Sequence, residues 1–195
     1  MNNPKKTVLS EGDRFLFTVA DVLSADECAS FIRLIESKGP EAAPITTAYG
    51  FLMRPDIRNN TRVMIDDPAR AGWLWDRVAA FIPPRIGPWR AVGLNERFRY
   101  YRYDPGQYFR WHGDGAFVRS HHERSLLTAM VYLNDEFEGG STDFSDYGSV
   151  IPARGSALFF EHPLLHQGAP VISGRKYVLR TDVMYQREGA TEARR

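Results

Sequence analysis

The 195-residue sequence contains one cysteine, Cys28, which excludes an intramolecular disulfide and a zinc site built from several cysteines. It also lacks an excess of charge of either sign, because 25 basic and 24 acidic residues give a formal net charge of +1. Such a chain has no overall field to recruit nucleic acid or an anionic membrane. No apolar run approaches the roughly 20 residues that cross a bilayer, and the first residues do not lead into a secretory signal. We therefore expect a cytoplasmic protein without a nucleic-acid or membrane partner.

The remaining composition is that of an ordinary globular protein, with 43% hydrophobic and 25% charged residues. A chain of this length suits a single domain with one core. The patterns described below divide residues 1–195 into an N-terminal helical support, about 8–90, and a β-rich core, about 94–186. The sequence does not indicate an oligomeric state.

Two helices are predicted in the first half. Ser24 and Glu27 have the spacing of a capping box, and apolar side chains follow at helical intervals until Gly39. A second helix is predicted from Asp67 as N-cap and Pro68 in the first turn. Residues 40–62, between the two, look like a long loop or short irregular strands. The two buried stripes are predicted to be Cys28, Phe31, Ile32 and Ile35, and Leu74, Val78, Phe81 and Ile82.

From about residue 94 the pattern changes to short runs rich in aromatic and branched residues, separated by turn sequences. Helices followed by many short strands indicate an α+β, mainly β chain, in which helices buttress an antiparallel barrel or sandwich. The predicted strands are residues 94–103, 125–133, 140–145, 156–160 and 175–185.

The last predicted strand has two different faces, because side chains alternate along a strand. One face suits packing against a helix, and the other has three charged residues and borders either solvent or a polar cavity. The first face consists of Tyr177, Leu179, Thr181, Val183 and Tyr185, and the second of Lys176, Val178, Arg180, Asp182 and Met184.

Three side chains form a candidate metal site. His112 and Asp114 point to the same side of an extended segment, and a histidine about 50 residues later would complete two imidazoles and one carboxylate. That set suits non-haem iron(II) with open coordination positions. His166 and His162 compete for the third place. His121 and His122 have the character of an exposed loop pair.

Four sequence blocks in the second half resemble the prolyl 4-hydroxylase-like iron(II)/2-oxoglutarate-dependent dioxygenases. The resemblance covers about residues 94–185. It implies a double-stranded β-helix, a jelly-roll or cupin-like barrel with the site inside one end. The blocks are residues 103–114, 128–135, 139–144 and 166–177.

The resemblance also implies roles for individual residues. His112, Asp114 and His166 match the iron ligands, and Lys176, ten residues after His166, matches the basic group that pairs with the distal carboxylate of 2-oxoglutarate. The neighbouring Arg175 is the alternative, although strand alternation favours Lys176. Further candidates for co-substrate binding are Tyr103, Tyr132, Thr128 and Arg180. For Arg180, an ion pair with Asp182 or another acid is an equal alternative.

The expected reaction is hydroxylation of a C–H bond with release of succinate and CO2. Iron(II), 2-oxoglutarate and O2 are the implied cofactors, and ascorbate is an additional one. The expected substrate is a peptidyl proline or a small amino-acid-like molecule. The alternative class is a metal-binding cupin-like protein or a metal-dependent isomerase, which would have no use for Lys176 in the cavity.

Three segments near the predicted site are of interest. Residues 46–62 form a candidate lid, and Arg110 and Trp111 are candidate rim residues. Residues 96–103 alternate arginine with tyrosine, a pattern that can bind nucleic acid. The near-neutral net charge favours a barrel wall with a few groups facing the substrate.

Overall fold

The protein is mostly β with two helices, in a computed structural model that describes residues 4–10, 14–47 and 49–189. The larger sheet has eleven strands, and its main path runs β1-β2-β16-β12-β19-β9-β6-β3, with β11 beside β12 and β7–β8 beside β19. These strands are β1 (Lys6–Val8), β2 (Leu16–Val19), β3 (Glu41–Ala42), β6 (Thr61–Asp66), β7 (Arg85–Ile86), β8 (Trp89–Leu94), β9 (Arg97–Tyr103), β11 (Val118–Ser120), β12 (Glu123–Tyr132), β16 (Ala157–Glu161) and β19 (Lys176–Arg187).

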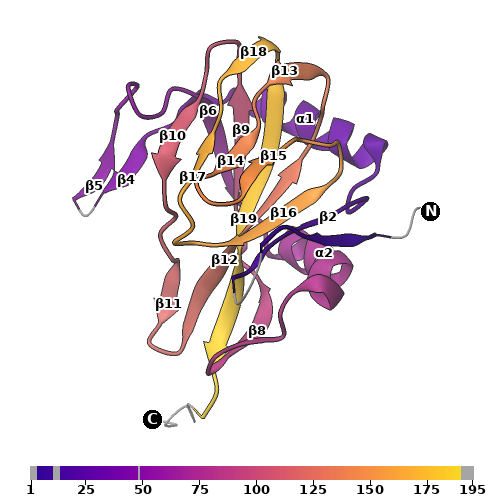
Figure 1. Cartoon of the computed structure of the whole chain (residues 1–195), viewed down its shortest axis with the longest axis vertical. Helices are drawn as coiled ribbons and strands as arrows, with labels where there is room; N and C mark the ends of the chain where they lie inside the picture. The colour runs from indigo at the N-terminus through magenta and orange to yellow at the C-terminus, as the bar shows by residue number, and fades with distance from the viewer. Residues whose placement is uncertain (1–3, 11–13, 48, 190–195) are drawn as a thin grey trace.

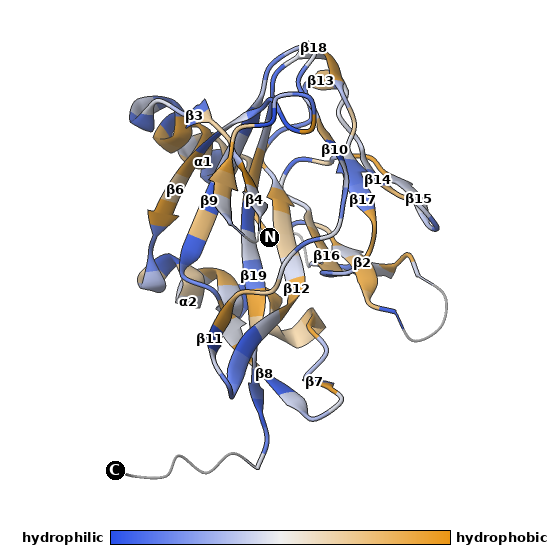
Figure 2. Ribbon diagram, turned by 90° about the vertical axis from the view of Figure 1, so that its left-hand side faces the viewer, coloured by the Kyte–Doolittle hydropathy of each residue, from blue (hydrophilic) through white to orange (hydrophobic). Residues whose placement is uncertain are grey.

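A four-stranded sheet, ordered β10-β17-β14-β15, lies in front of the larger one, and two two-stranded sheets complete the described part of the fold (Figure 1). Figures 1 and 2 show the helices on the opposite side of the larger sheet. The strands are β10 (Phe109–His112), β14 (Thr142–Phe144), β15 (Gly148–Val150) and β17 (His166–Gly168), with the pairs β4 (Ile45–Thr47) with β5 (Gly50–Leu52) and β13 (Phe137–Gly139) with β18 (Val171–Gly174).

Both predicted helices are present. Helix α1 (Ala25–Lys38) begins at the predicted capping box, since Ser24 accepts from the Glu27 amide and Glu27 accepts from the Ser24 amide; it ends at Gly39 in the left-handed conformation. Helix α2 (Pro68–Val78) is capped by Asp67 and continues as the short 3-10 helix η1 (Ala79–Phe81). Their apolar faces cover one side of the larger sheet.

The alternation predicted for the last strand is confirmed. Tyr177, Leu179 and Val183 of β19 belong to the core between helices and sheet, and the Tyr177 hydroxyl donates to Glu36 of α1 at 2.7 Å. The opposite face of β19 turns toward the four-stranded sheet, where Val178 packs in a second, aromatic-rich core. The site described below lies between these two sheets.

Two features differ from the sequence prediction. In the described part of the chain the two sheets share no hydrogen-bonded ladder, so they face each other as layers joined by side-chain packing and do not close into the predicted barrel. The N-terminal part also supplies β2 and β6 to the larger sheet, beside β16 and β9, in addition to helices. Most residues of β6 are half-buried, so neither face of the strand is clearly apolar. The sequence therefore shows little of the alternation that would predict this strand.

Candidate metal and co-substrate site

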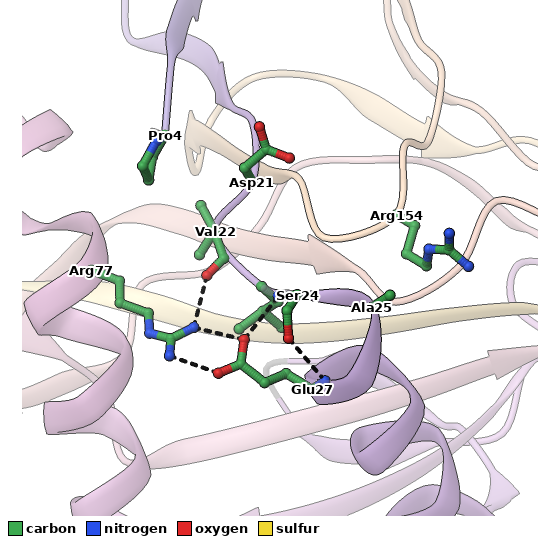
Figure 3. Close-up of a pocket in the computed structure, with 9 residues that line it drawn as sticks. Pro4, Asp21, Val22, Ser24, Ala25, Glu27, Arg77 and Arg154 are labelled. Carbon is green, nitrogen blue, oxygen red and sulfur yellow. Dashed lines mark hydrogen bonds and ion pairs between the residues drawn. The ribbon is translucent and has the colours of Figure 1, made fainter. Parts of the chain in front are cut away.

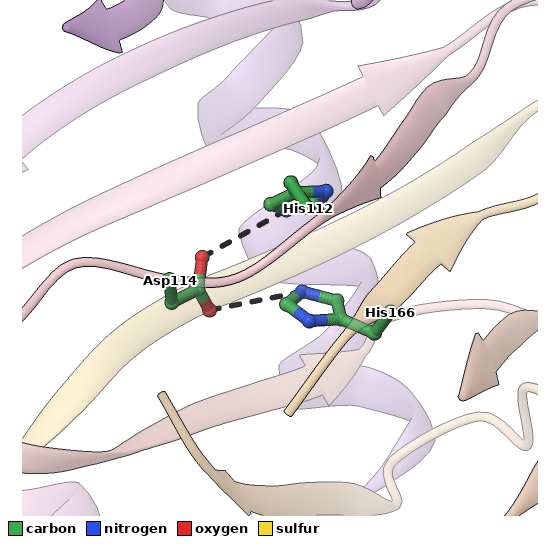
Figure 4. Close-up of side chains that lie close together, drawn as sticks. All are labelled: His112, Asp114 and His166. Atoms are coloured by element: carbon green, nitrogen blue, oxygen red, sulfur yellow. Dashed lines mark ion pairs between the residues drawn. The ribbon is translucent and has the colours of Figure 1, made fainter. Parts of the chain in front are cut away.

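His112, Asp114 and His166 converge between the two sheets (Figure 4). His112 ends β10 and His166 begins β17, and these two residues are direct partners across the antiparallel pair. Asp114 follows two residues after His112, and its backbone amide donates to the His162 carbonyl at 2.7 Å. One donor atom from each of the three side chains lies within 4.8 Å of the others. The site is therefore assembled by strand register and one loop contact.

Both imidazoles are oriented by a backbone carbonyl two residues earlier. Nδ1 of His112 lies 2.6 Å from the Arg110 carbonyl, and Nδ1 of His166 lies 2.8 Å from the Leu164 carbonyl. A carbonyl only accepts, so Nδ1 holds the proton and Nε2 keeps a free lone pair. Each Nε2 faces Asp114 at 3.8 Å, which is longer than a hydrogen bond and suits an ion held between the atoms.

Electrostatics keep these groups in the forms that bind a metal. Burial lowers the pKa of His112 to about 4 and also lowers the pKa of His166, so both rings are neutral near pH 7. Burial alone would raise the pKa of Asp114, but Arg180, the two imidazoles and the hydrogen bond from Thr128 together outweigh it and hold that pKa well below its ordinary range. Neutral imidazoles and an ionised carboxylate are the ligand forms that a divalent cation requires.

A chain of hydrogen bonds supports Asp114 from behind. The Thr128 hydroxyl donates to the Asp114 carboxylate at 2.6 Å. The oxygen of this hydroxyl lies 3.0 Å from Nδ1 of His162. Nε2 of His162 contacts the Ser125 hydroxyl at 2.8 Å, which in turn accepts from the Phe117 amide. With both ring nitrogens engaged, His162 lies outside the three-residue cluster and orients Thr128 instead.

Lys176 enters the same cavity from β19, with 2% of its surface exposed. Its Nζ donates to the Gly140 carbonyl at 2.6 Å and lies over the rings of Tyr103 and Tyr132, at 5.3 and 5.6 Å from their centroids. Burial lowers the pKa of Lys176 to about 7. The Tyr132 hydroxyl contacts Thr142, which also lines the cavity.

The structure separates Lys176 from its neighbour. Arg175 lies outside the cavity and pairs with Asp104 at 2.6 Å, as strand alternation predicts. Arg180 lines the cavity and forms ion pairs with Asp114 at 3.0 Å and Asp182 at 3.4 Å, which is the ion-pair alternative for this residue. Thr128 contacts Asp114 at the back of the site. Co-substrate binding stays a prediction for all five candidates, which are Lys176, Tyr103, Tyr132, Thr128 and Arg180.

The contact between Ser125 and His162 was hidden in the sequence. Ser125 and His162 have no local pattern that marks them, since they meet through pairing of distant segments. The predicted rim residues Arg110 and Trp111 are exposed, and Arg110 donates to the Asp56 carbonyl at 2.6 Å. The predicted lid contains the β4–β5 hairpin; its residue 48 lies outside the described residues.

A larger hollow of about 720 Å³ lies at the start of α1 (Figure 3). Its charged groups already have partners, because Arg77 pairs with Glu27 at 2.6 Å and also donates to the Val22 carbonyl. The cavity beside His112 has a smaller volume, about 30 Å³. We locate the chemistry there, because it combines metal-binding side chains with a buried ammonium group.

Comparisons with known proteins agree with this site. The model of the 2OG-Fe(II) oxygenase superfamily matches residues 98–181. A protein of Acanthamoeba polyphaga mimivirus, provisionally named prolyl 4-hydroxylase, is 35% identical over 97 residues, which are 40% of each chain. Prolyl 4-hydroxylase 1 of Arabidopsis thaliana is 23% identical over 91% of this chain and 71% of its own. This chain thus spans less than half of the viral relative.

Solved structures show the same fold. The viral collagen prolyl hydroxylase of Paramecium bursaria Chlorella virus-1 has a TM-score of 0.62 and 23% identity, covering 89% of this chain and 97% of that one. A prolyl hydroxylase from Trichoplax adhaerens, in complex with a hypoxia inducible factor peptide fragment, has a TM-score of 0.67 and 15% identity, covering 86% and 82%.

The family match, the named relatives and the shared fold support the predicted resemblance to prolyl 4-hydroxylase-like 2OG-Fe(II) oxygenases. They do not favour the alternative of a non-oxygenase cupin-like protein or isomerase. Within the part of the chain that the structure describes, no helix has both the length and the apolar character needed to span a membrane.

Proposed function

We propose that this protein is an iron(II)- and 2-oxoglutarate-dependent hydroxylase acting on a proline residue of a peptide substrate. The observation that supports it most directly is the pairing of the His112, Asp114 and His166 cluster with a buried Lys176 in one cavity. Prolyl hydroxylases recur among the relatives and structural neighbours, and one of those neighbours is in complex with a peptide.

The three clustered side chains fit ferrous iron. Two neutral imidazoles and one carboxylate, with no thiolate, are the donors of the non-haem iron(II) oxygenases and leave positions open on one side. In this proposal Nε2 of His112, Nε2 of His166 and the Asp114 carboxylate hold the metal. Bound iron, with 2-oxoglutarate and O2, supplies the oxidising power for C–H hydroxylation with release of succinate and CO2.

Lys176 is proposed to receive the distal carboxylate of 2-oxoglutarate. Its ammonium group has only the Gly140 carbonyl as a hydrogen-bond partner in the described structure, and a carboxylate in that place would replace a neutral acceptor by an ionic one. Tyr103 and Tyr132 enclose the ammonium group and exclude water, which strengthens such a pairing. Arg180 keeps Asp114 ionised and ready for the metal.

The finer parts of the proposal combine the family resemblance with the composition and length of the sequence. We propose a single domain over residues 1–195, in which the two facing sheets correspond to a double-stranded β-helix. Ascorbate is proposed as an auxiliary reductant, and the cytoplasm as the location.

The test begins with anaerobic addition of iron(II) and 2-oxoglutarate to the purified protein. We expect a co-substrate-dependent absorption band, and, after air is admitted, formation of succinate. Blocked proline peptides should then raise succinate formation and gain one oxygen atom by mass spectrometry. Absence of the band and of succinate would contradict the assignment.

A further inference from the structure

Four arginines gather on the side of the cavity that faces β6. Strand register places Arg62 of β6 opposite Tyr101 of β9, and Arg99 opposite Arg180 of β19, so these side chains share the inner face of the larger sheet. Arg58 joins them from the loop that precedes β6, with its guanidinium carbon 4.6 Å from the Tyr101 ring centroid. Tyr101 itself lines the cavity beside His112.

Arg58 is the most firmly held of the four. It is 4% exposed, and its Nε donates to the side chain of the fully buried Asn60 at 2.7 Å. Its guanidinium carbon lies 4.5 Å from the ring centroid of Phe109, and that ring stacks on His112 with centroids 3.5 Å apart. A single aromatic ring therefore separates the Arg58 guanidinium from a predicted metal ligand.

The charges of this group do not balance. Asp182 pairs with both Arg99 and Arg180, and Asp114 pairs with Arg180. Among the described residues, no acidic side chain lies within ion-pair distance of Arg58 or Arg62.

Three buried polar atoms of this group lack a hydrogen-bond partner among the described residues: Nη2 of Arg58, the hydroxyl of Tyr101 and Nε of Arg180. They mark where a ligand would bind. A buried guanidinium with a free N–H group is costly unless an anion reaches it. Arg62 is half-buried, lies over Phe51 of the β4–β5 hairpin, and adds a second unpaired positive charge on the same face.

We propose that the prime substrate carries a carboxylate group close to the carbon that is hydroxylated, and that Arg58, with Arg62, binds it. The proposal rests on the proposed function and adds a substrate class to it. Planar guanidinium groups match a carboxylate in shape and charge. The carboxylate belongs either to an acidic side chain next to the proline or to the proline itself at a free C-terminus; both present the same chemistry to Arg58.

Binding is measured with fluorescent, blocked proline peptides on protein loaded with Mn(II) and 2-oxoglutarate. Glutamate is placed in turn on each side of the proline, and each peptide is matched with its glutamine and lysine versions. A peptide that ends in proline is tested with a free C-terminal carboxylate and as the C-terminal amide. This comparison tests the carboxylate of the proline itself as the bound group. We expect one carboxylate peptide to bind about 10- to 100-fold more tightly than its neutral match.

The variants Arg58→Gln and Arg62→Gln should reduce this preference toward one, and Arg62→Glu should shift it toward the lysine peptide. Arg97→Gln is the matched control, because Arg97 lies on the same face of β9 but is already paired with Asp66. In the Arg97→Gln control, the peptide preference and the KM for 2-oxoglutarate, measured without peptide, should stay as in the wild type.

Equal binding of every matched pair by the wild type would overturn the inference, and so would an increased KM for 2-oxoglutarate in Arg58→Gln. Mass spectrometry of the same peptides judges the proposed function separately. A peptide that binds through its carboxylate without gaining oxygen would support this inference while contradicting hydroxylation of proline.

Discussion

The guanidinium of Arg180 lies 3.0 Å from the carboxylate of Asp114 between the two sheets, and the two side chains are only 13% and 5% exposed. The sequence places these residues 66 positions apart, on the last strand and on the loop after β10. Their contact provides a positive charge beside the proposed metal position before any metal is bound. Asp114 is thereby ionised and held in place.

Replacing Arg180 by Met should destabilise the metal-free protein. Loss of one partner from a buried ion pair costs about 3–5 kcal/mol, because the other charge stays buried without compensation. Iron(II) should reduce the deficit, since it supplies positive charge to Asp114. Urea denaturation with and without iron measures both effects. Arg119→Met, which removes surface pairs with Glu123 and Glu96, should cost at most about 1 kcal/mol for each pair; equal losses in the two variants would contradict the prediction.

Substitution of His112 or Asp114 by Ala should remove both bound iron and 2-oxoglutarate turnover. Each side chain supplies one of three donors, and the remaining two cannot hold the ion at micromolar concentration. Iron content and succinate formation are measured on the same samples. His121→Ala, at an exposed position, is the control and should behave as wild type. Normal turnover by His112→Ala would refute the ligand assignment.

Lys176→Ala should raise the KM for 2-oxoglutarate by about 10- to 100-fold, the usual value of a hydrogen bond between charged groups. Iron binding should be unaffected, because Lys176 is not part of the metal cluster. Steady-state kinetics with varied 2-oxoglutarate give the KM. The neighbouring variant Arg175→Ala changes an exposed pair with Asp104 and should leave the KM unchanged. The opposite pattern would assign the role to Arg175.

The same lysine should make the stability of the metal-free protein depend on pH. Burial lowers the pKa of Lys176 to about 7 from 10.5, so between these values the unfolded chain binds a proton that the folded chain has released. The free energy of unfolding should therefore rise with pH in this window, by at most about 1.4 kcal/mol per pH unit from this group. Urea denaturation at pH 7.5 and 9.0 should show a smaller rise for Lys176→Met. An equal rise of the free energy of unfolding in the wild type and in Lys176→Met would contradict the low pKa of Lys176.

Thr128→Val should weaken iron binding by about 10- to 100-fold without unfolding the protein, because it cuts the hydrogen-bond chain that orients Asp114. Titration with iron(II) or Mn(II) measures the affinity, and circular dichroism checks the fold. Thr46→Val, on the exposed face of β4, is the control. Unchanged affinity would mean that Arg180 alone holds the carboxylate.

Local patterns in the sequence were sufficient for the helices and for the family. The capping box of Ser24 and Glu27 starts α1, and the alternation after Lys176 separates the helix side of β19 from the cavity side. The four sequence blocks that include His112, Asp114 and His166 resemble a family that the comparisons also support.

Long-range register was not predictable in the same way. Strand β6 pairs with β9 although its own residues show little alternation, and this pairing brings Arg62 opposite Tyr101. The position of Arg58 depends on its contacts with Phe109, which lies about 50 residues later. Such contacts arise from tertiary packing, and a single sequence contains no periodic signal for them.

The carbonyls of Arg110 and Leu164 have a consequence for loading the protein with iron. Each carbonyl fixes the orientation of one imidazole ring and keeps the proton on Nδ1, away from the proposed metal position. The two side chains have therefore lost their rotational freedom during folding, before a metal binds. Metal binding then does not have to supply the free energy of ordering these two side chains, and the affinity is higher for that reason. Apoprotein and iron protein should consequently share one backbone conformation, and the site should refill rapidly after chelation.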